Sequence, residues 1–356
     1  MSSPRPPGHA ATIEAVATLA KVSVATVSRA LRNLPNVAEE TRKRVHIAAE
    51  QLNYRPDPNA SRLATGRTQA IGMAVPMLDR WYFSTVVGAA HAVLVDEGYD
   101  LLLFGVATPE DRGRFITEWA VLGKRVDGVI LVDLKLDPIE IEDLAHSEAR
   151  VVTVGNLHPP FSSVTVDNRA ASAVATRHLL NLGHREIALI GHQQGDWPFQ
   201  VPNDRHDGYV DALKEFGITP RPELQRAGAF EIDGGYDAMT DLLALQNPPT
   251  AVFSMSDEMA FGAIKAIRDH GLRVPEDISV VGFDDHEMAK VMDLTTIRQP
   301  VQESGELIAR QMISTLKAKA TNDPDGLSPV HRQLRTHLVV RRTTAPARIH
   351  PKSFPM

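Results

Sequence analysis

The sequence has no cysteine among its 356 residues, so disulfide bonds, thiolate chemistry and zinc sites built on cysteine are excluded. No apolar run approaches the roughly 20 residues of a membrane-spanning helix. The first nine residues contain three prolines and no apolar segment, so we expect no secretory signal. These absences lead us to expect a cytoplasmic protein.

The charge is distributed unevenly along the chain. The net charge is −6, but residues 1–67 carry ten Lys/Arg and five Asp/Glu, whereas residues 68–356 carry 28 and 39. A basic end on an acidic body favours contact with a polyanion, although chance scatter in a short window gives the same count. Hydrophobic residues make up 43% of the chain, which is ordinary for a globular protein, and the length suggests two or three domains.

The N-terminal segment has a helical pattern. Apolar residues recur at i, i+3, i+4 and i+7 from Ile13 to Ala20, which predicts a helix with one buried face. Ser23 stands where an N-cap belongs, so residues 24–31 are expected to form a second short helix. The pattern returns over residues 39–52. Residues 54–58 then have the composition of a linker, and residues 59–64 can form a helix too short to be stable alone.

Two helices joined by a short turn, with a serine cap on the second, are typical of a helix-turn-helix, whose second helix enters the major groove of DNA. Arg29 can bind guanine O6 and N7, whereas Val24 and Ala25 can make only apolar contacts, for example with a thymine methyl. The outward-facing candidates are Val24, Ala25, Ser28 and Arg29, and the candidates for phosphate contacts are Thr12, Ser23, Thr26 and Arg32. The alternative is a small helical cap that packs on the rest of the chain.

From residue 69 onward, apolar strands alternate with amphipathic helices. The expected strands cover residues 70–75, 101–105, 128–132, 151–154, 187–191, 251–254 and 278–283, and the expected helices cover residues 84–97, 170–182, 205–216, 234–245, 259–270 and 302–319. This alternation predicts parallel sheets covered by helices on both faces. Because the segment is long for one such sheet, we expect two α/β lobes.

Ligands of open α/β sheets bind beyond the carboxyl ends of the strands. This rule singles out Asp284 after one expected strand, and Ser256 and Asp257 after another. No dinucleotide-binding glycine pattern follows a strand, and neither a phosphate-binding loop nor a Gly-x-Ser-x-Gly elbow is present. The 14 histidines do not have the spacing of metal ligands. We therefore expect a ligand pocket, with no catalytic residue, cofactor or metal.

Many ordered segments resemble the LacI/GalR family of transcriptional regulators. They include VSVATVSRAL (22–31), LGHREI (182–187), SDEMA (256–260), VVGFDD (280–285) and LTTIRQP (294–300), with further matches at 12–17, 40–42, 52–56, 63–67 and 127–130. The likeness covers nearly the whole chain. It implies a three-helix helix-turn-helix headpiece with a hinge helix, followed by a two-lobed α/β domain with parallel sheets that resembles periplasmic sugar-binding proteins.

The resemblance also implies the domain boundaries. The headpiece is expected at residues 10–56, the hinge at 57–67, the effector-binding and dimerisation domain at 68–343, and a tail at 344–356. Within the effector domain, the first lobe is expected at 69–167 and 300–328, and the second at 168–299 and 329–343. The chain departs from the family at Lys21, where the turn usually has glycine, and at Ala38, where the third helix usually has a serine cap. Lys21 must therefore accept a less favourable backbone or a shifted turn.

Residue roles follow from the resemblance by position. Val24, Ala25 and Arg29 fall at base-reading positions. On the hinge helix, Leu63 falls where paired leucines of two subunits wedge into the minor groove, with Asn59 and Ala60 as further DNA contacts. An ordinary buried leucine is the alternative for Leu63.

Further matches place residues in an effector pocket. Arg205 and Asp284 fall where the family holds its effector, and Ser256 lies at a neighbouring strand end. Tyr82, Phe83 and Phe230 fall at its aromatic walls. Charged groups that bind hydroxyl pairs and rings that cover an apolar face suit a sugar. The alternative is a structural ion pair between Arg205 and Asp284, with the aromatic rings in the core.

These expectations describe a transcriptional repressor, a homodimer or tetramer, that binds double-stranded operator DNA under the control of a small molecule, most simply a sugar. Two alternatives from other classes remain. A sugar-binding transport protein would share the body but have an export signal and no headpiece, and a sugar-processing α/β enzyme would turn a sugar over.

Overall fold

The computed structural model describes residues 12–31, 35–54, 68–147, 149–191, 199–321, 323 and 325–348. The chain divides into two compact units between Thr68 and Gln69, and each is described by itself. The expected hinge helix at 57–67 lies outside the described residues, as does most of the tail.

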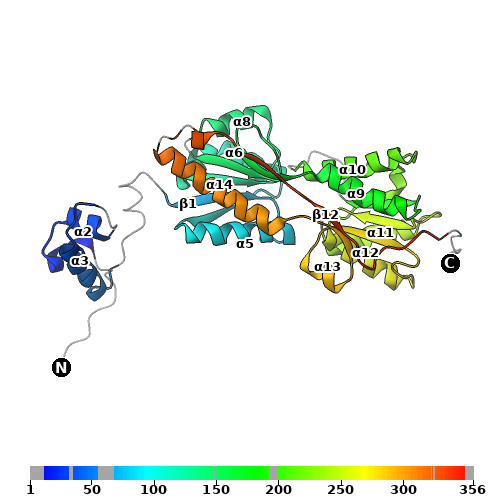
Figure 1. The fold of residues 1–356 in the computed structure, drawn as a ribbon, viewed down its shortest axis with the longest axis horizontal. Coiled ribbons are helices and arrows are strands. Elements are labelled where there is room, and N and C mark those ends of the chain that lie inside the picture. Colours follow the sequence, from blue (N-terminus) through cyan, green and yellow to red (C-terminus); the bar gives the residue numbers. More distant parts are fainter. Residues whose placement is uncertain are drawn as a thin grey trace, which may run out of the picture. The chain divides into compact units, whose positions relative to one another are not determined.

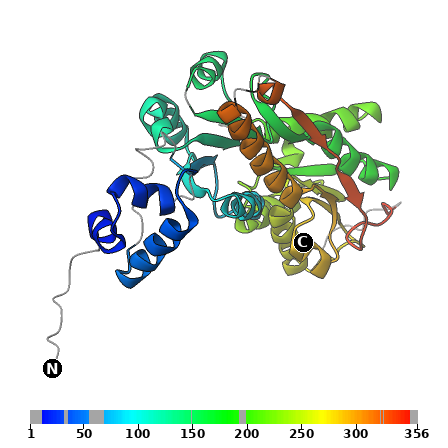
Figure 2. The same cartoon turned by 60° about the vertical axis from the view of Figure 1, so that its left-hand side comes forward.

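In its described residues, the N-terminal unit contains three short helices, α1 (Ile13–Ala20), α2 (Val24–Leu31) and α3 (Glu39–Gln51) (Figure 2). Its core consists of buried valines and alanines from all three helices: Val16, Ala17, Ala20, Val27, Ala30, Val45, Ala48 and Ala49. Small side chains let the helices approach closely, and the apolar spacing that predicted each helix is the spacing that buries this core.

The second unit contains two six-stranded sheets (Figure 1). The first has the order β11 (His331–Leu334), β5 (Ser162–Val166), β4 (Arg150–Val154), β3 (Gly128–Val132), β1 (Ala70–Val75) and β2 (Asp100–Gly105), and every neighbouring pair is parallel. The second has the order β12 (His337–Val339), β10 (Thr295–Arg298), β9 (Ser279–Asp284), β8 (Ala251–Ser254), β6 (Ile187–Gly191) and β7 (Gln225–Ala227). Only the β10–β12 pair is antiparallel in this second sheet as described.

Helices cover both faces of each sheet. The first sheet carries α5 (Trp81–Asp96), α6 (Pro109–Thr117), α7 (Trp119–Leu122), α8 (Pro138–Ala145) and α14 (Val301–Thr321), and the second carries α9 (Asn168–Asn181), α10 (Val201–Glu215), α11 (Ile232–Leu243), α12 (Asp257–Asp269) and α13 (Glu287–Val291). Successive residues of a strand point to opposite faces. In β1, Ile71 and Met73 accordingly face α5 and α14, whereas Ala70 and Ala74 face the core that includes α6 and α8.

The chain passes between the two lobes at three places: between β5 and α9, between β10 and α14, and between β11 and β12. We expected the last return to the second lobe at residue 329, and this is too early. β11 (His331–Leu334) still pairs with β5 in the first sheet, and the crossing comes between Leu334 and His337. Residues 331–333 are three consecutive polar residues exposed at a sheet edge, so this strand lacks the apolar signal of a buried one.

The seven strands expected from apolar runs are β1, β2, β3, β4, β6, β8 and β9, each within one residue of its expected bounds. Five others were not expected: β5, β7, β10, β11 and β12. Three of these, β7, β11 and β12, stand at sheet edges and contain no fully buried residue, which explains the missing apolar signal. The predicted fold class, a helix-turn-helix headpiece followed by a two-lobed α/β domain with parallel sheets, is confirmed.

Candidate functional site

The turn between α1 and α2 is closed without a glycine. Lys21 ends α1 with φ 54° and ψ 48°, the left-handed conformation, and its N–H donates to carbonyls of the last turn. The N–H of Val22 donates to the carbonyl of Ala17 at 3.0 Å, which completes the helix end. Of the two outcomes expected for Lys21, the structure shows the less favourable backbone.

Hydroxyl groups hold the starts of the first two helices. The N–H of Thr26 donates to Oγ of Ser23 at 3.1 Å, and the two hydroxyl oxygens lie 2.9 Å apart. Thr12 caps α1 by accepting from the N–H of Ala15. Ala38 offers no such cap to α3, whose first turn instead carries two glutamates.

The second helix has two distinct faces. Val27 and Ala30 are fully buried, whereas Val24 is 40% exposed, Ala25 and Arg29 are exposed and Ser28 is half-buried. The exposed side chains of Val24, Ala25 and Arg29 therefore form one accessible strip. These are the residues that the sequence predicted to contact bases. The other predicted DNA contacts, Arg32, Asn59, Ala60 and Leu63, lie outside the described residues.

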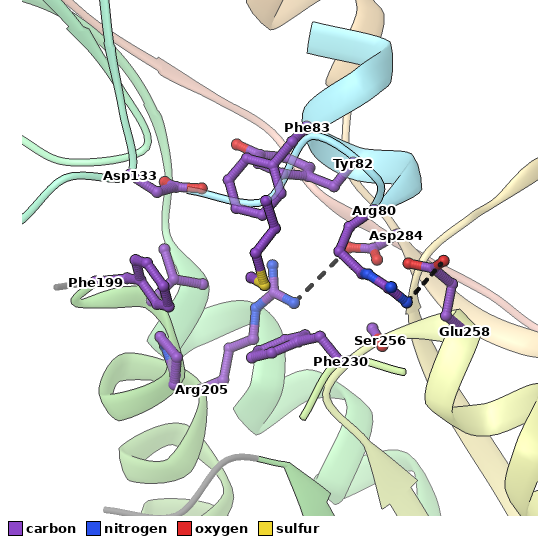
Figure 3. Close-up of a pocket in the computed structure, with 13 residues that line it drawn as sticks. Arg80, Tyr82, Phe83, Asp133, Phe199, Arg205, Phe230, Ser256, Glu258 and Asp284 are labelled. Carbon is purple, nitrogen blue, oxygen red and sulfur yellow. Dashed lines mark ion pairs between the residues drawn. The ribbon is translucent and has the colours of Figure 1, made fainter. Parts of the chain in front are cut away.

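In the second unit, a cavity of about 480 Å³, its open mouth included, lies between the two lobes (Figure 3). The first lobe contributes Met77, Arg80, Tyr82, Phe83 and Asp133, and the second contributes Phe199, Val201, Pro202, Arg205, Phe230, Ser256, Glu258 and Asp284. Asp133, Ser256 and Asp284 follow or end strands β3, β8 and β9, which is where open α/β sheets bind ligands.

Arg205, in the first turns of α10, is only 4% exposed and is held from several sides. Its Nε donates to Oδ1 of Asn168 at 2.9 Å, and Nη1 donates to the carbonyl of Met255 at 2.5 Å. Its guanidinium lies 3.6 Å from the ring centroid of Phe283, and Nη1 is 3.7 Å from Oδ1 of Asp284. A buried cation is costly unless it is paired and hydrogen-bonded, and here it is both.

Asp284, the last residue of β9, is held with a positive φ of 120°, a strained backbone for aspartate. Its Oδ1 accepts a hydrogen bond from Nε2 of Gln299 at 2.7 Å. Burial raises the pKa of Asp284 to about 7, and Arg205 partly offsets this shift. Arg205 and Asp284 do form the ion pair that we weighed as an alternative, but both side chains also line the cavity.

Asp133 was missed by the sequence interpretation. It directly follows β3, 4% exposed, and burial raises its pKa to about 7. The Tyr82 hydroxyl hydrogen-bonds its carboxyl group, while Oδ1 has no hydrogen-bond partner among the described residues. The signal was present, because an aspartate after an apolar strand is the pattern that singled out Asp284.

All six predicted pocket residues, namely Tyr82, Phe83, Arg205, Phe230, Ser256 and Asp284, line the same cavity. Tyr82 and Phe83 meet edge to face with ring centroids 5.1 Å apart. Ser256 also caps α12, since its Oγ accepts from the N–H of Met259 at 3.3 Å. Asp257, which the strand-end rule also singled out, is fully buried and is not among the residues that line the cavity. It accepts hydrogen bonds from the Thr296 hydroxyl and from the N–H of His286.

In the described parts of the chain, no group of three or more histidine, aspartate or glutamate side chains is arranged to hold a metal ion. No helix in those parts is long and apolar enough to span a bilayer.

Comparisons with known proteins match both units. Residues 12–57 match the family model for bacterial regulatory proteins of the lacI family, and residues 176–344 match the periplasmic binding protein-like domain. The chain is 34% identical over 322 residues to the probable HTH-type transcriptional repressor ExuR of Bacillus subtilis (strain 168), covering 87% of this chain and 93% of that protein. It is also 34% identical over 301 residues to the repressor CytR of Escherichia coli (strain K12), covering 83% and 87%.

Solved structures agree. The Lac repressor dimer bound to operator and the anti-inducer ONPF matches with a TM-score of 0.81 and 28% identity, over 95% of this chain and all of that one. The complex of the transcriptional regulator CelR with cellobiose matches with a TM-score of 0.66 and 30% identity, over 94% and 99%.

These matches distinguish among the three classes of protein that the sequence left open: a regulator, a transport protein and an enzyme. Residues 12–57 match the headpiece that a transport protein was expected to lack, and the relatives are transcriptional repressors, not enzymes. The chain belongs to the lacI family of bacterial regulatory proteins, as its sequence resemblance implied.

Proposed function

We propose that this regulator represses transcription by binding operator DNA, and that a sugar-like small molecule in the interlobe cavity controls its affinity for the operator. The observation that carries the proposal is the cavity itself, which carboxylates, two arginines and aromatic rings from both lobes line together. A coupling of roughly 1–3 kcal/mol between the two sites would be typical of such control.

The chemistry of the cavity suits a ligand with several hydroxyl groups. Asp133 and Asp284 line the cavity, and their carboxyl groups can accept hydrogen bonds from hydroxyls. Arg205 can donate to hydroxyl or ring oxygens. Tyr82 and Phe230 offer ring faces to the apolar side of a sugar. The cellobiose complex of the related CelR supports a saccharide ligand.

For DNA, we propose that α2 enters the major groove, with Arg29 on a guanine and with Val24 and Ala25 against thymine methyls. The strip of exposed side chains on α2 supports this role. Ser28 would face the groove beside them. Thr12, Ser23, Thr26 and Arg32 would contact the phosphates, and Asn59, Ala60 and Leu63 of the hinge would contact the minor groove. These assignments follow the family's layout.

We further propose that the effector domain at residues 68–343 dimerises, so that two headpieces at residues 10–56 contact a pseudo-palindromic operator in the cytoplasm. The Lac repressor dimer on its operator supports this arrangement.

A ligand screen tests the proposal directly. Thermal unfolding of the full chain would be measured with ribose, cellobiose and a panel of other neutral sugars, and each stabilising sugar would then be added to an operator-binding assay. We expect at least one sugar both to raise the unfolding temperature and to change operator affinity. A sugar that stabilises the chain but leaves DNA binding unchanged would contradict the coupling.

The Asp284→Asn variant tests whether the ligand binds in this cavity. This variant keeps the size of the side chain but weakens its hydrogen bonds to hydroxyl donors, so we expect the sugar response to be lost and operator binding to be kept. Asp211→Asn, at an exposed ion pair on α10, is the matched control and should keep both. A full sugar response in Asp284→Asn would place the ligand elsewhere.

A further inference from the structure

Arg80, at the start of α5 in the first lobe, reaches across to the second lobe. Its guanidinium pairs with Asp79 of its own lobe at 2.6 Å. It also lies 3.9 Å from Oε1 of Glu231 and 4.0 Å from Oε1 of Glu258, both of which belong to the second lobe. Figure 3 shows Arg80 and Glu258 facing each other in the wall of the cavity.

Glu258 also holds the start of α5. Arg80 occupies the N-cap of this helix but makes no side-chain cap, and the first turn has no acidic residue of its own. The carboxylate of Glu258, in the first turn of α12, accepts a hydrogen bond from the backbone N–H of Trp81. The free N–H groups at a helix start need an acceptor and favour a negative charge. Here the acceptor comes from the opposite lobe.

A ring contact lies beside these charges. The indole of Trp81 packs on the imidazole of His286 with ring centroids 4.8 Å apart, and His286 meets the ring of Phe261 edge-on at 5.5 Å. His286 and Phe261 belong to the second lobe. Two adjacent residues of the first lobe thus make an ion pair, a backbone hydrogen bond and a ring contact with the second.

We propose that Arg80, Trp81, Glu258 and His286 form a clasp between the lobes that closes the cavity before any ligand arrives. Because Tyr82 and Phe83 follow immediately on α5, the clasp also positions the aromatic wall of the cavity. Opening the lobes would separate Glu258 from the helix start, leave Arg80 with Asp79 alone and expose the Trp81 ring. The four residues are therefore positioning residues that bias the lobes towards closure.

Distance measurement on the ligand-free full chain tests the clasp, so the outcome does not depend on the identity of the effector. The chain has no cysteine, so Ile139→Cys on α8 and Lys214→Cys on α10 give one exposed labelling site on each lobe. Spin-labelled chain, diluted with unlabelled chain to suppress signals between subunits, would report the distance between the lobes.

We expect the clasp-intact chain to give a narrow, short distance distribution, and the Arg80→Ala/Trp81→Ala variant to shift it by several ångströms to longer and broader distances. Arg112→Ala is the matched control. Its ion pair with Glu140 lies within the first lobe, and its side chain is 20% exposed compared with 19% for Arg80. This control should leave the distribution unchanged.

Glu258→Gln provides a second test if the double variant does not fold. It removes the charge but keeps an oxygen for the Trp81 N–H, so a smaller shift in the same direction is expected. An unchanged distribution in a folded Arg80→Ala/Trp81→Ala variant, or in Glu258→Gln where the double variant does not fold, would overturn the proposal. An equal shift in Arg112→Ala would also overturn it.

Discussion

The two units place their candidate functional residues in opposite environments. In the headpiece, Arg29, Val24 and Ala25 are exposed on a helix whose other face supplies the core. In the effector domain, Arg205, Asp284 and Asp133 are at least nine-tenths buried and make contacts that the fold itself needs. A surface that meets DNA can be altered without loss of the fold, whereas a pocket of buried charges couples binding to stability.

The largest effect that would sharpen this comparison is expected for Arg205→Leu. Removing the guanidinium leaves the buried carboxyl group of Asp284 without its positive partner and the carbonyl of Met255 without its donor, so the free energy of unfolding should fall by about 3–5 kcal/mol. Arg177→Leu, at an exposed ion pair with Glu215, should cost less than about 1 kcal/mol. Urea denaturation of both variants measures the difference, and similar losses would show that Arg205 contributes little to the fold.

The pH dependence of stability gives the next largest effect. Burial raises the pKa of Asp133 to about 7, above its ordinary value of 3.8. A group whose pKa is raised on folding contributes stability that is complete below pH 3.8 and is lost as the pH rises through 7. Asp133→Asn does not titrate, so we expect it to be more stable than the unchanged chain at pH 8, by up to about 4 kcal/mol, and to lose this advantage towards pH 4.

The control for this titration has the opposite sign. Arg169 holds the pKa of exposed Asp211 below its ordinary value, so the contribution of Asp211 is lost only as the pH falls below about 4. Asp211→Asn should therefore match the unchanged chain at low pH and be slightly less stable at pH 8. Urea denaturation at several pH values measures both variants. Parallel stability curves for Asp133→Asn and the unchanged chain would mean that Asp133 is not desolvated.

On the headpiece, Arg29→Ala should affect DNA binding alone. Loss of a bidentate contact to guanine should cost about 1–3 kcal/mol of operator affinity and relax specificity at one base pair. Because Arg29 is exposed, the stability of the fold should change by less than about 0.5 kcal/mol. Arg29→Lys keeps the charge but loses the planar fork, so it should also relax specificity. Equal weakening on all duplexes would instead indicate a phosphate contact.

The same contrast between the units explains what the sequence could predict. The bounds and the exposed strip of helix α2 depend on the spacing of residues that are close in the sequence, so both could be predicted from it. The strand-end rule found Asp284 and Ser256, and it would also have found Asp133. The rule could not find Arg80 or Glu258. These residues belong to different lobes, and they come together only because the chain passes between the lobes three times.

The smallest expected effect is on the turn between α1 and α2, where the backbone conformation of one residue affects the stability of the headpiece. Lys21 has φ 54°, a conformation that costs a side-chain-bearing residue about 1 kcal/mol and glycine much less. Lys21→Gly should therefore stabilise the headpiece by up to about 1 kcal/mol, whereas Lys43→Gly, inside α3, should destabilise it by a similar amount. Hydrogen exchange of the buried Val27 and Val45 amides in the full chain should slow in the first variant and accelerate in the second. Faster exchange in both would mean that the Lys21 side chain makes contacts that outweigh its backbone strain.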